Sequence, residues 1–305
     1  MRMVRPRSVP AGDGLLPAGV RASPGTVGYL GADAALTVYT SAGAAPPGCV
    51  WNFQQPPGPA YLTTTTNDVW IDHAKIFGEL LLLHQNLTVT NSKVITDSGA
   101  LYSIHGDIGS TGTMIVRDNT IQRLNAAAGD VNSAVTSIGP SLQLVRCEIL
   151  GTGDALQPNI MGGNTILISQ CYVHDLAKVD AEQHLDPVQP FQGETSAATS
   201  AVTIEHNWLD AIGSGSTAIV TPNSAVTLGQ NSSNGFEKYN PVLINNNYLA
   251  GGVLHLRIYQ NTGNVRVTNN RFGPIVDVGT HVVENPGGVI EWTGNTDSNG
   301  NPVNM

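Results

Sequence analysis

The sequence is short of charge, of basic residues and of cysteine, and each shortage excludes a class of protein. Charged residues make up 12% of its 305 residues, and 14 Lys and Arg against 23 Asp and Glu leave a net charge of −9. Nucleic-acid binding needs a concentrated basic face, so we expect no nucleic-acid partner. The same balance offers no general attraction for a polyanionic glycan. Three cysteines are an odd number, which is a poor basis for a disulfide framework.

Other common signals are absent as well. No apolar run reaches the about 18 residues of a membrane-spanning helix, so we expect no membrane insertion. The first residues, MRMVRPRSVPAGDGLL, begin basic but lack the apolar segment of a secretory signal, and we expect no export by that route. No nucleophile elbow, zinc spacing, phosphate loop or dinucleotide fingerprint occurs, which argues against the corresponding hydrolase, metal and nucleotide classes.

What the sequence does contain is one short pattern repeated nine times. Two apolar residues stand two positions apart, a small or amide residue follows three positions later, and a last apolar residue follows after two more. Val202, Ile204, Asn207 and Leu209 form one copy. The small or amide position is occupied in turn by Ala74, Ser92, Asn119, Cys147, Cys171, Asn207, Asn247, Asn270 and Asn295. Intervals of roughly 20 to 40 residues are typical of solenoids, and alternation at period two indicates strands with one buried face.

The small or amide position predicts a structural ladder. Asn tolerates a left-handed backbone at a tight bend and forms hydrogen bonds with neighbouring backbone groups. Stacked coils bring like positions about 4.8 Å apart, so Asn207, Asn247 and Asn270 are expected to stack with inward-facing side chains. Cys147 and Cys171 occupy the same position one coil apart, and we expect two buried, reduced thiols.

Three segments, VTIEHNWLDAI, VLINNNYLAGG and VRVTNNRFGP, resemble right-handed parallel β-helix proteins of the pectate-lyase-like superfamily. The similarity is greatest to the β-helix proteins of actinobacteria and of the tails of their phages, and it covers roughly residues 60–297. It implies an all-β, right-handed parallel β-helix of about nine coils. It leaves the activity open, because this fold hosts lyases, hydrolases, epimerases and inert adhesins.

The chain divides into three regions. Residues 1–60 are rich in Pro, Gly and Ala, and we expect an extended arm that docks onto a partner or caps the first coil. Residues 61–297 are the predicted β-helix, and residues 298–305 are a polar tail. Insertions lengthen the repeat between residues 171 and 247.

A second, smaller repeat gives the best candidate site. GDALQPN and LDPVQPF share the pattern Asp-x-apolar-Gln-Pro, and weaker copies stand at residues 133–136 and 217–220. In-register stacking would place Asp154 over Asp186 and Gln157 over Gln189. Two carboxylates that close share a proton or a cation, which is suited to acid/base work or to a hard cation such as Ca²⁺. The alternative is purely structural, with these side chains satisfying backbone groups in the stacked turns.

Polar residues gather around the second copy. Catalytic candidates are Asp154, Asp186 and His184, and the binding candidates are Gln157, Gln189, Lys178, Glu182, His255 and Arg257. In the resembled superfamily a His-x-Asp-x-x-Gln segment often carries Gly after the Asp. His184, Asp186 and Gln189 match that segment, but Pro187 stands in the Gly position. The substitution stiffens the backbone and removes an N–H group, which weakens the transfer of a catalytic role.

Three functions compete. The leading hypothesis is a virion structural protein, a phage tail β-helix that faces the host envelope, binds its glycan and contacts other tail proteins through the arm. The alternatives are a polysaccharide lyase or glycoside hydrolase, tail-borne or secreted, and an extracellular adhesin. An enzyme needs an open groove with converging acid and base residues, and a binder needs exposed aromatic residues. Homo-oligomerisation is left open.

Overall fold

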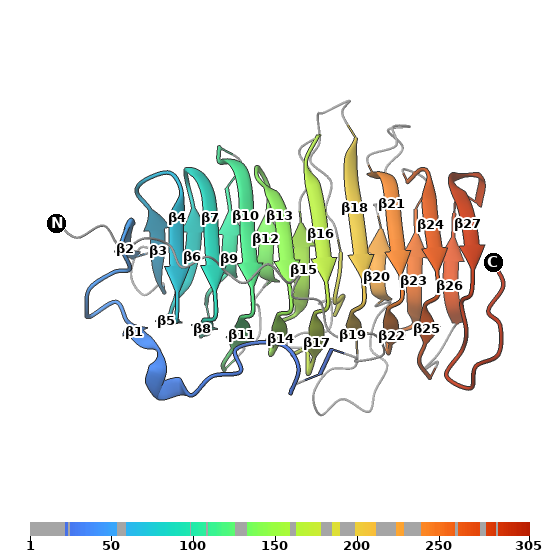
Figure 1. The fold of residues 1–305 in the computed structure, drawn as a ribbon, viewed down its shortest axis with the longest axis horizontal. Helices are drawn as coiled ribbons and strands as arrows, with labels where there is room; N and C mark the ends of the chain where they lie inside the picture. Colours follow the sequence, from blue (N-terminus) through green and yellow to red (C-terminus); the bar gives the residue numbers. More distant parts are fainter. Residues whose placement is uncertain are drawn as a thin grey trace.

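The structure is a computed structural model of the whole chain, and its description covers most of the repeat region. The described residues are 22–23, 25–53, 59–97, 99–107, 109–125, 133–158, 163–177, 185–189, 199–211, 224–228, 239–259, 262–274, 279–284 and 286–305. The strands lie side by side along one long axis, from the blue N-terminal end to the red C-terminal end (Figure 1). The predicted right-handed parallel β-helix is confirmed.

The strands form three long faces, which we name sheets A, B and C. Sheet A contains β1 (Thr37–Tyr39), β5 (Ala74–Phe77), β8 (Lys93–Thr96), β11 (Thr120–Arg123), β14 (Glu148–Leu150), β17 (Tyr172–His174), β19 (Trp208–Asp210), β22 (Tyr248–Ala250) and β25 (Arg271–Phe272). Sheet C contains β4 (Val69–Asp72), β7 (Gln85–Thr90), β10 (Thr111–Arg117), β13 (Ser141–Val145), β16 (Thr165–Ser169), β18 (Ser200–Glu205), β21 (Tyr239–Asn245), β24 (Val265–Thr268) and β27 (Val289–Thr293).

Sheet B has two parts joined through Val188. The first part contains β2 (Cys49–Phe53), β3 (Ala60–Thr64), β6 (Glu79–Leu82), β9 (Tyr102–Gly106), β12 (Ser133–Ser137) and β15 (Asp154–Pro158), and the second contains β20 (Ser224–Leu228), β23 (Leu254–Ile258) and β26 (Gly279–Val283). Val188 forms single parallel bridges to Leu156 and to Val226. Two short 3₁₀ helices, η1 (Asp33–Ala35) and η2 (Pro286–Gly288), complete the described elements. No helix among them is long and apolar enough to span a membrane.

The core follows directly from the alternation in the sequence. In sheet C, Leu142, Ile166 and Val202 lie in register on successive strands and are almost fully buried. Each coil therefore covers the apolar side chains of the coils before and after it, which is how a solenoid gains stability from neighbour contacts.

The amide ladder is confirmed at the corner between sheets C and A. The Oδ1 of Asn247 accepts hydrogen bonds from the main-chain N–H (3.0 Å) and the Nδ2 (2.9 Å) of Asn207. The Oδ1 of Asn270 accepts the N–H of Asn247 in the same way (3.0 Å). Cys147 and Cys171 are buried free thiols in line with this ladder, where Asn207 Oδ1 accepts the N–H of Cys171 (2.7 Å).

The left-handed backbone lies one residue before the ladder position. His206, Asn246 and Asn269 have φ angles of 58°, 53° and 57°, whereas the ladder residues that follow them do not have positive φ. The bend is made by an exposed residue, and this leaves the ladder side chain free to point inward. Asn in the ladder is thus selected for its hydrogen bonds and not for its backbone preference.

Both ends of the solenoid are covered by chain from outside the repeat. At the N-terminal end, β1 pairs parallel with β5 and β2 pairs antiparallel with β3. The arm runs along the outer side of sheet A, where the N–H of Gly28 donates to the main-chain O of Arg146 (2.8 Å) (Figure 1). At the other end, Trp292 Nε1 donates to the O of Val303 (2.7 Å), so the C-terminal residues fold back over the last coil. The edges of β5 and β3 are therefore covered, which hinders strand addition by other chains at those two strands.

Candidate functional site

The repeated Asp-x-apolar-Gln-Pro pattern stacks in register, as predicted. Leu156 bridges to Val188, and the main-chain N–H of Asp186 donates to the Oδ1 of Asp154 (2.9 Å). The next coil in this stack begins at Ser224, whose sequence SAVT repeats residues 133–136. The weaker copy proposed at residues 217–220 lies outside the described residues.

Asp154 and Asp186 are bound to the main chain of the following coil. Asp154 Oδ2 accepts a hydrogen bond from Gln157 Nε2 (2.5 Å), and Asp186 Oδ1 accepts one from the N–H of Ser224 (2.6 Å). Burial raises the pKa of Asp154 from 3.8 to about 7. Burial and then the charge of Asp154 raise the pKa of Asp186, which is 1% exposed. The pair can hold and release a proton, but two of its oxygens accept main-chain N–H groups and a third accepts the side chain of Gln157.

A row of polar side chains runs along the outer face of sheet B beside these carboxylates. It consists of His105, Thr136, Gln157, Gln189, Thr227 and Arg257, one from each of six successive coils. We call it the polar row. Leu156, Val188 and Val226, each one position earlier on its strand, point into the core, so the polar row faces outward.

Several atoms of the polar row are buried without a hydrogen-bond partner. They are His105 Nε2, Thr136 Oγ1, Gln189 Oε1 and Arg257 Nε. Buried polar atoms in native proteins nearly always have partners, so a run of such atoms along one line calls for an explanation. Thr136 and Gln189 are respectively 4% and 9% exposed. The partly exposed members of the row, His105, Gln157 and Arg257, are the ones that a ligand bearing hydroxyl groups could contact directly.

The other predicted site residues lie in different parts of the molecule. His184, Lys178 and Glu182 lie outside the described residues. Arg257 belongs to the polar row, where it donates to Glu284 (3.2 Å) and lies over the Tyr259 ring (4.4 Å to the centroid). Its positive charge also acts on Asp186 and tends to lower the pKa of that carboxyl.

His255 does not join the predicted site. It is 1% exposed, its Nε2 is 3.3 Å from the main-chain O of Pro274, and its ring lies 5.8 Å from that of Phe272. Burial lowers its pKa. His255 and Arg257, two positions apart on β23, have different neighbours: His255 lies beside Phe272 and Pro274, whereas Arg257 contacts Glu284 and Tyr259.

A calcium site has limited support in the described part of the chain. No group of three or more His, Cys, Asp or Glu side chains that could hold a metal ion occurs there. Asp154 and Asp186 would therefore have to be completed by amide or main-chain oxygens.

A second row, of aromatic side chains, was missed by the sequence analysis as a connected feature. Tyr172, Trp208 and Tyr248 lie in register on the outer face of sheet A, with centroids 5.8 Å and 4.6 Å apart, and His174 stacks on Tyr172 at 4.0 Å. Each follows a ladder residue directly, so the repeat itself carried the signal. Phe272, by contrast, is fully buried. Because Tyr172, Trp208 and Tyr248 are partly exposed, the chain has the accessible aromatic side chains that a glycan-binding protein needs.

Comparison with known proteins adds no assignment, because no family model, curated protein or solved structure matches this chain.

Proposed function

We propose that this chain is a structural β-helix of a phage tail, of the pectate-lyase-like kind, that faces the host envelope and binds its glycan along the polar row. The observation that carries the proposal is the line of six polar side chains in register on the outer face of sheet B, of which His105, Gln157 and Arg257 are partly exposed. Sugar hydroxyl groups both donate and accept hydrogen bonds, so an extended glycan would contact the partly exposed His105, Gln157 and Arg257, and it would satisfy Thr136 and Gln189, two coils apart, once their side chains turn toward it. The net charge of −9 favours a glycan that is not strongly acidic.

Binding is favoured over catalysis by what the carboxylates do. Asp154 and Asp186 accept main-chain N–H groups of the following coils, and Asp186 is almost fully buried. A general acid or base must reach the proton that it transfers. Carboxylates that hold adjacent coils together are better suited to keeping the polar row in register.

The arm has features that suit contact with other tail proteins. Leu30, Val38 and Phe53 are each more than half exposed although they are apolar, and all three lie between residues 25 and 53. Exposed apolar side chains that gather in one region commonly mark a protein interface. The proposed location is the virion, and purified phage particles analysed by mass spectrometry would separate this function from that of a bacterial adhesin.

The glycan proposal is tested by binding to purified host-wall polysaccharides. Gln189→Leu removes a hydrogen-bonding group from the polar row, and we expect at least tenfold weaker binding measured by calorimetry. Gln143→Leu is the matched control, because Gln143 lies on sheet C and away from the polar row. Equal affinities for the two variants, or no binding by the unaltered chain to any wall polysaccharide, would remove the polar row as a glycan site.

One observation favours the enzyme as a second candidate. The pKa of Asp154 is raised to about 7 and Asp186 lies on the next coil, so the pair holds a proton near neutral pH. A positioned acid or base typically contributes about 10²–10⁴ in rate. If a host polysaccharide is cleaved, Asp186→Asn should abolish turnover, followed by reducing ends or by the absorbance of unsaturated products, while the β-sheet circular dichroism is kept.

A further inference from the structure

A separate cavity of about 350 Å³ opens at the corner between sheets A and B, close to the N-terminal end. It is lined by residues of β5, β6 and β8, by Leu124 directly after β11, by Ala60 at the start of β3, and by the arm at Ser41 and Pro59. Its volume falls at the lower end of the roughly 300–1,000 Å³ that is usual for small-ligand sites. Its lining residues lie on coils that precede Asp154 and Asp186, and none of them belongs to the polar row.

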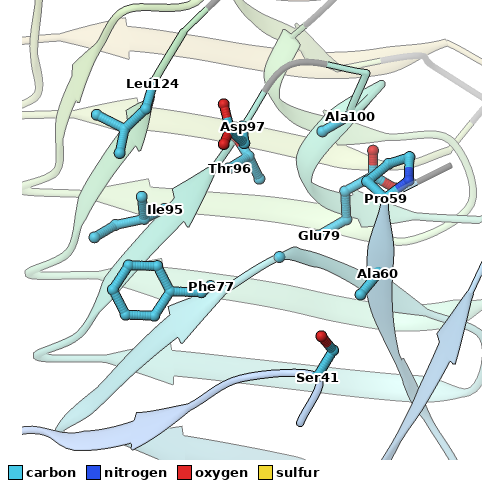
Figure 2. A pocket seen from close by; sticks show the side chains of 11 residues that line it. Ser41, Pro59, Ala60, Phe77, Glu79, Ile95, Thr96, Asp97, Ala100 and Leu124 are labelled. Atoms are coloured by element: carbon cyan, nitrogen blue, oxygen red, sulfur yellow. The ribbon is translucent and has the colours of Figure 1, made fainter. Parts of the chain in front are cut away.

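The cavity has an apolar side and an acidic side. Figure 2 places Phe77, Ile95 and Leu124 on one side, Glu79 with Pro59 and Ala100 on the other, and Thr96 and Asp97 between them. Phe77 and Leu124 are 40% and 39% exposed, which is unusual for large apolar side chains. The apolar side is therefore accessible to a ligand.

Glu79 is held in a fixed position at the wall of this cavity by main-chain hydrogen bonds. Its side chain is 9% exposed, and its Oε1 accepts the main-chain N–H groups of Leu101 and of Tyr102 (3.2 Å) on the next coil of sheet B. Its Oε2 accepts no hydrogen bond from the described residues. One oxygen thus fixes the carboxylate, and the other is left to a ligand.

The surroundings of Glu79 keep its negative charge only partly compensated. Arg123 acts on the carboxylate from β11, but its own guanidinium is held by the main-chain O of Ala100 (2.6 Å). Asp97 adds a second carboxylate to the lining. Lys75 Nζ lies 5.5 Å from the Phe77 ring centroid, but Asp33 pairs with it at 2.8 Å and compensates its charge. An aromatic ring and two carboxylates around one cavity favour a positive charge.

We propose that this cavity binds an organic ammonium ion with a short apolar chain, the ammonium at Glu79 Oε2 and the chain against Phe77, Ile95 and Leu124. The same chemistry is presented by a free alkylamine and by a lysine side chain of another protein. A carboxylate would be repelled by the negative charges of Glu79 and Asp97, and an uncharged alcohol would gain only the apolar contact. The inference does not depend on glycan binding or on the phage origin.

The test is calorimetric titration of the full chain with n-butylammonium chloride, with n-butanol and sodium butyrate as controls. We expect n-butylammonium to bind at least tenfold more tightly than n-butanol, and butyrate not to bind. Glu79→Gln keeps an oxygen for Leu101 and Tyr102 but removes the charge, and it should abolish the preference for the ammonium. Equal affinity for n-butanol and n-butylammonium, or an unchanged preference in Glu79→Gln, would overturn the proposal.

A second variant covers the case in which Glu79→Gln does not fold. Phe77→Ser alters a side chain that is already 40% exposed, and it should weaken n-butylammonium at least fivefold without unfolding the solenoid. An unchanged affinity in Phe77→Ser also counts against the cavity. A short acetylated peptide with one central lysine distinguishes the two sources, because tighter binding of the peptide than of n-butylammonium would identify a protein side chain as the ligand.

Discussion

Single residues in this molecule hold the coils in register through hydrogen bonds between neighbours. Asn247 accepts from the N–H of Asn207, and its Nδ2 donates to the main-chain O of Ile204 (2.9 Å) and to Asn270 Oδ1 (3.0 Å). Each bond joins one coil to another. The ladder thus converts a sequence repeat into a fixed stacking order.

Asn247→Ala should therefore be strongly destabilising. It leaves the buried N–H of Asn207 and the O of Ile204 without partners, each at a cost of about 1–3 kcal/mol. We expect the free energy of unfolding to fall by several kcal/mol in denaturant titrations.

Asn246→Gly is the control for this prediction. Asn246 precedes the ladder residue and has a φ of 53°, a conformation that glycine adopts without strain. We expect a change below about 1 kcal/mol, because only an exposed contact with His206 is lost. Similar losses in the two variants would mean that the ladder hydrogen bonds are not what stabilises this corner.

The carboxylate of Asp154 should make stability depend on pH. Its pKa rises from 3.8 to about 7 on folding, so between these values the folded state keeps a proton that the unfolded chain has released. Raising the pH through this window therefore favours unfolding, and the melting temperature should fall. The carboxyl groups of Asp33 and Asp72 have lowered pKa values, so their contribution to folded-state stability is lost as the pH falls below 3.8.

Asp154→Asn should weaken this dependence between pH 4 and pH 7, and the part that remains comes from Asp186, whose pKa is also raised by burial. Asn retains an oxygen for the N–H of Asp186 but does not titrate. Melting curves of both proteins at several pH values measure the difference. Parallel curves would show that Asp154 titrates normally in the folded state.

Among the elements, β1 and β2 stand apart because they belong to the arm and not to the repeat. They cover β5 and β3, which would otherwise be edge strands with free N–H and C=O groups. Ion pairs from Asp33 to Lys75 (2.8 Å) and Lys93 (2.6 Å) add to the contact, although exposed pairs contribute little.

Deleting residues 1–53 should lower the melting temperature and speed hydrogen exchange in β3 and β5, while β24 exchanges as before. The β-sheet circular dichroism should be largely kept, since most coils are intact. Deletion of residues 1–21 alone is the control, because it leaves β1 and β2 in place. If the two truncated chains melt at the same temperature, capping by β1 and β2 does not stabilise the solenoid.

The whole molecule is a stack in which each coil contacts its neighbours. Stability is then roughly a sum of coil and interface contributions, and disturbance at one end need not reach the other. Phe272→Ala removes a fully buried ring near the C-terminal end and should cost about 3–5 kcal/mol locally.

Hydrogen exchange of Phe272→Ala should accordingly increase in β22, β24 and β27. Strands β7 and β8, at the other end, should exchange at the same rate as in the unaltered chain. Mass spectrometry of peptides from both ends gives the comparison. A uniform increase along the chain would indicate a single cooperative unit instead of a one-dimensional stack.

The sequence by itself determined the repeat and everything that depends on periodicity. Alternation at period two marked the core strands, and the small or amide position located the ladder that Asn207, Asn247 and Asn270 form. The offset between GDALQPN and LDPVQPF likewise placed Asp154 beside Asp186. These features rest on local pattern and on stacking, and both can be read from one chain.

The tertiary structure alone decided what those residues contact. Asp154 and Asp186 accept main-chain N–H groups of the next coil. Which group each carboxylate meets depends on how the successive coils stack, and residue type alone does not determine it. Phe77 and Glu79 face one cavity only because two sheets meet at a corner there. Side-chain partners across coils depend on insertions and corners, whose geometry the repeat does not encode.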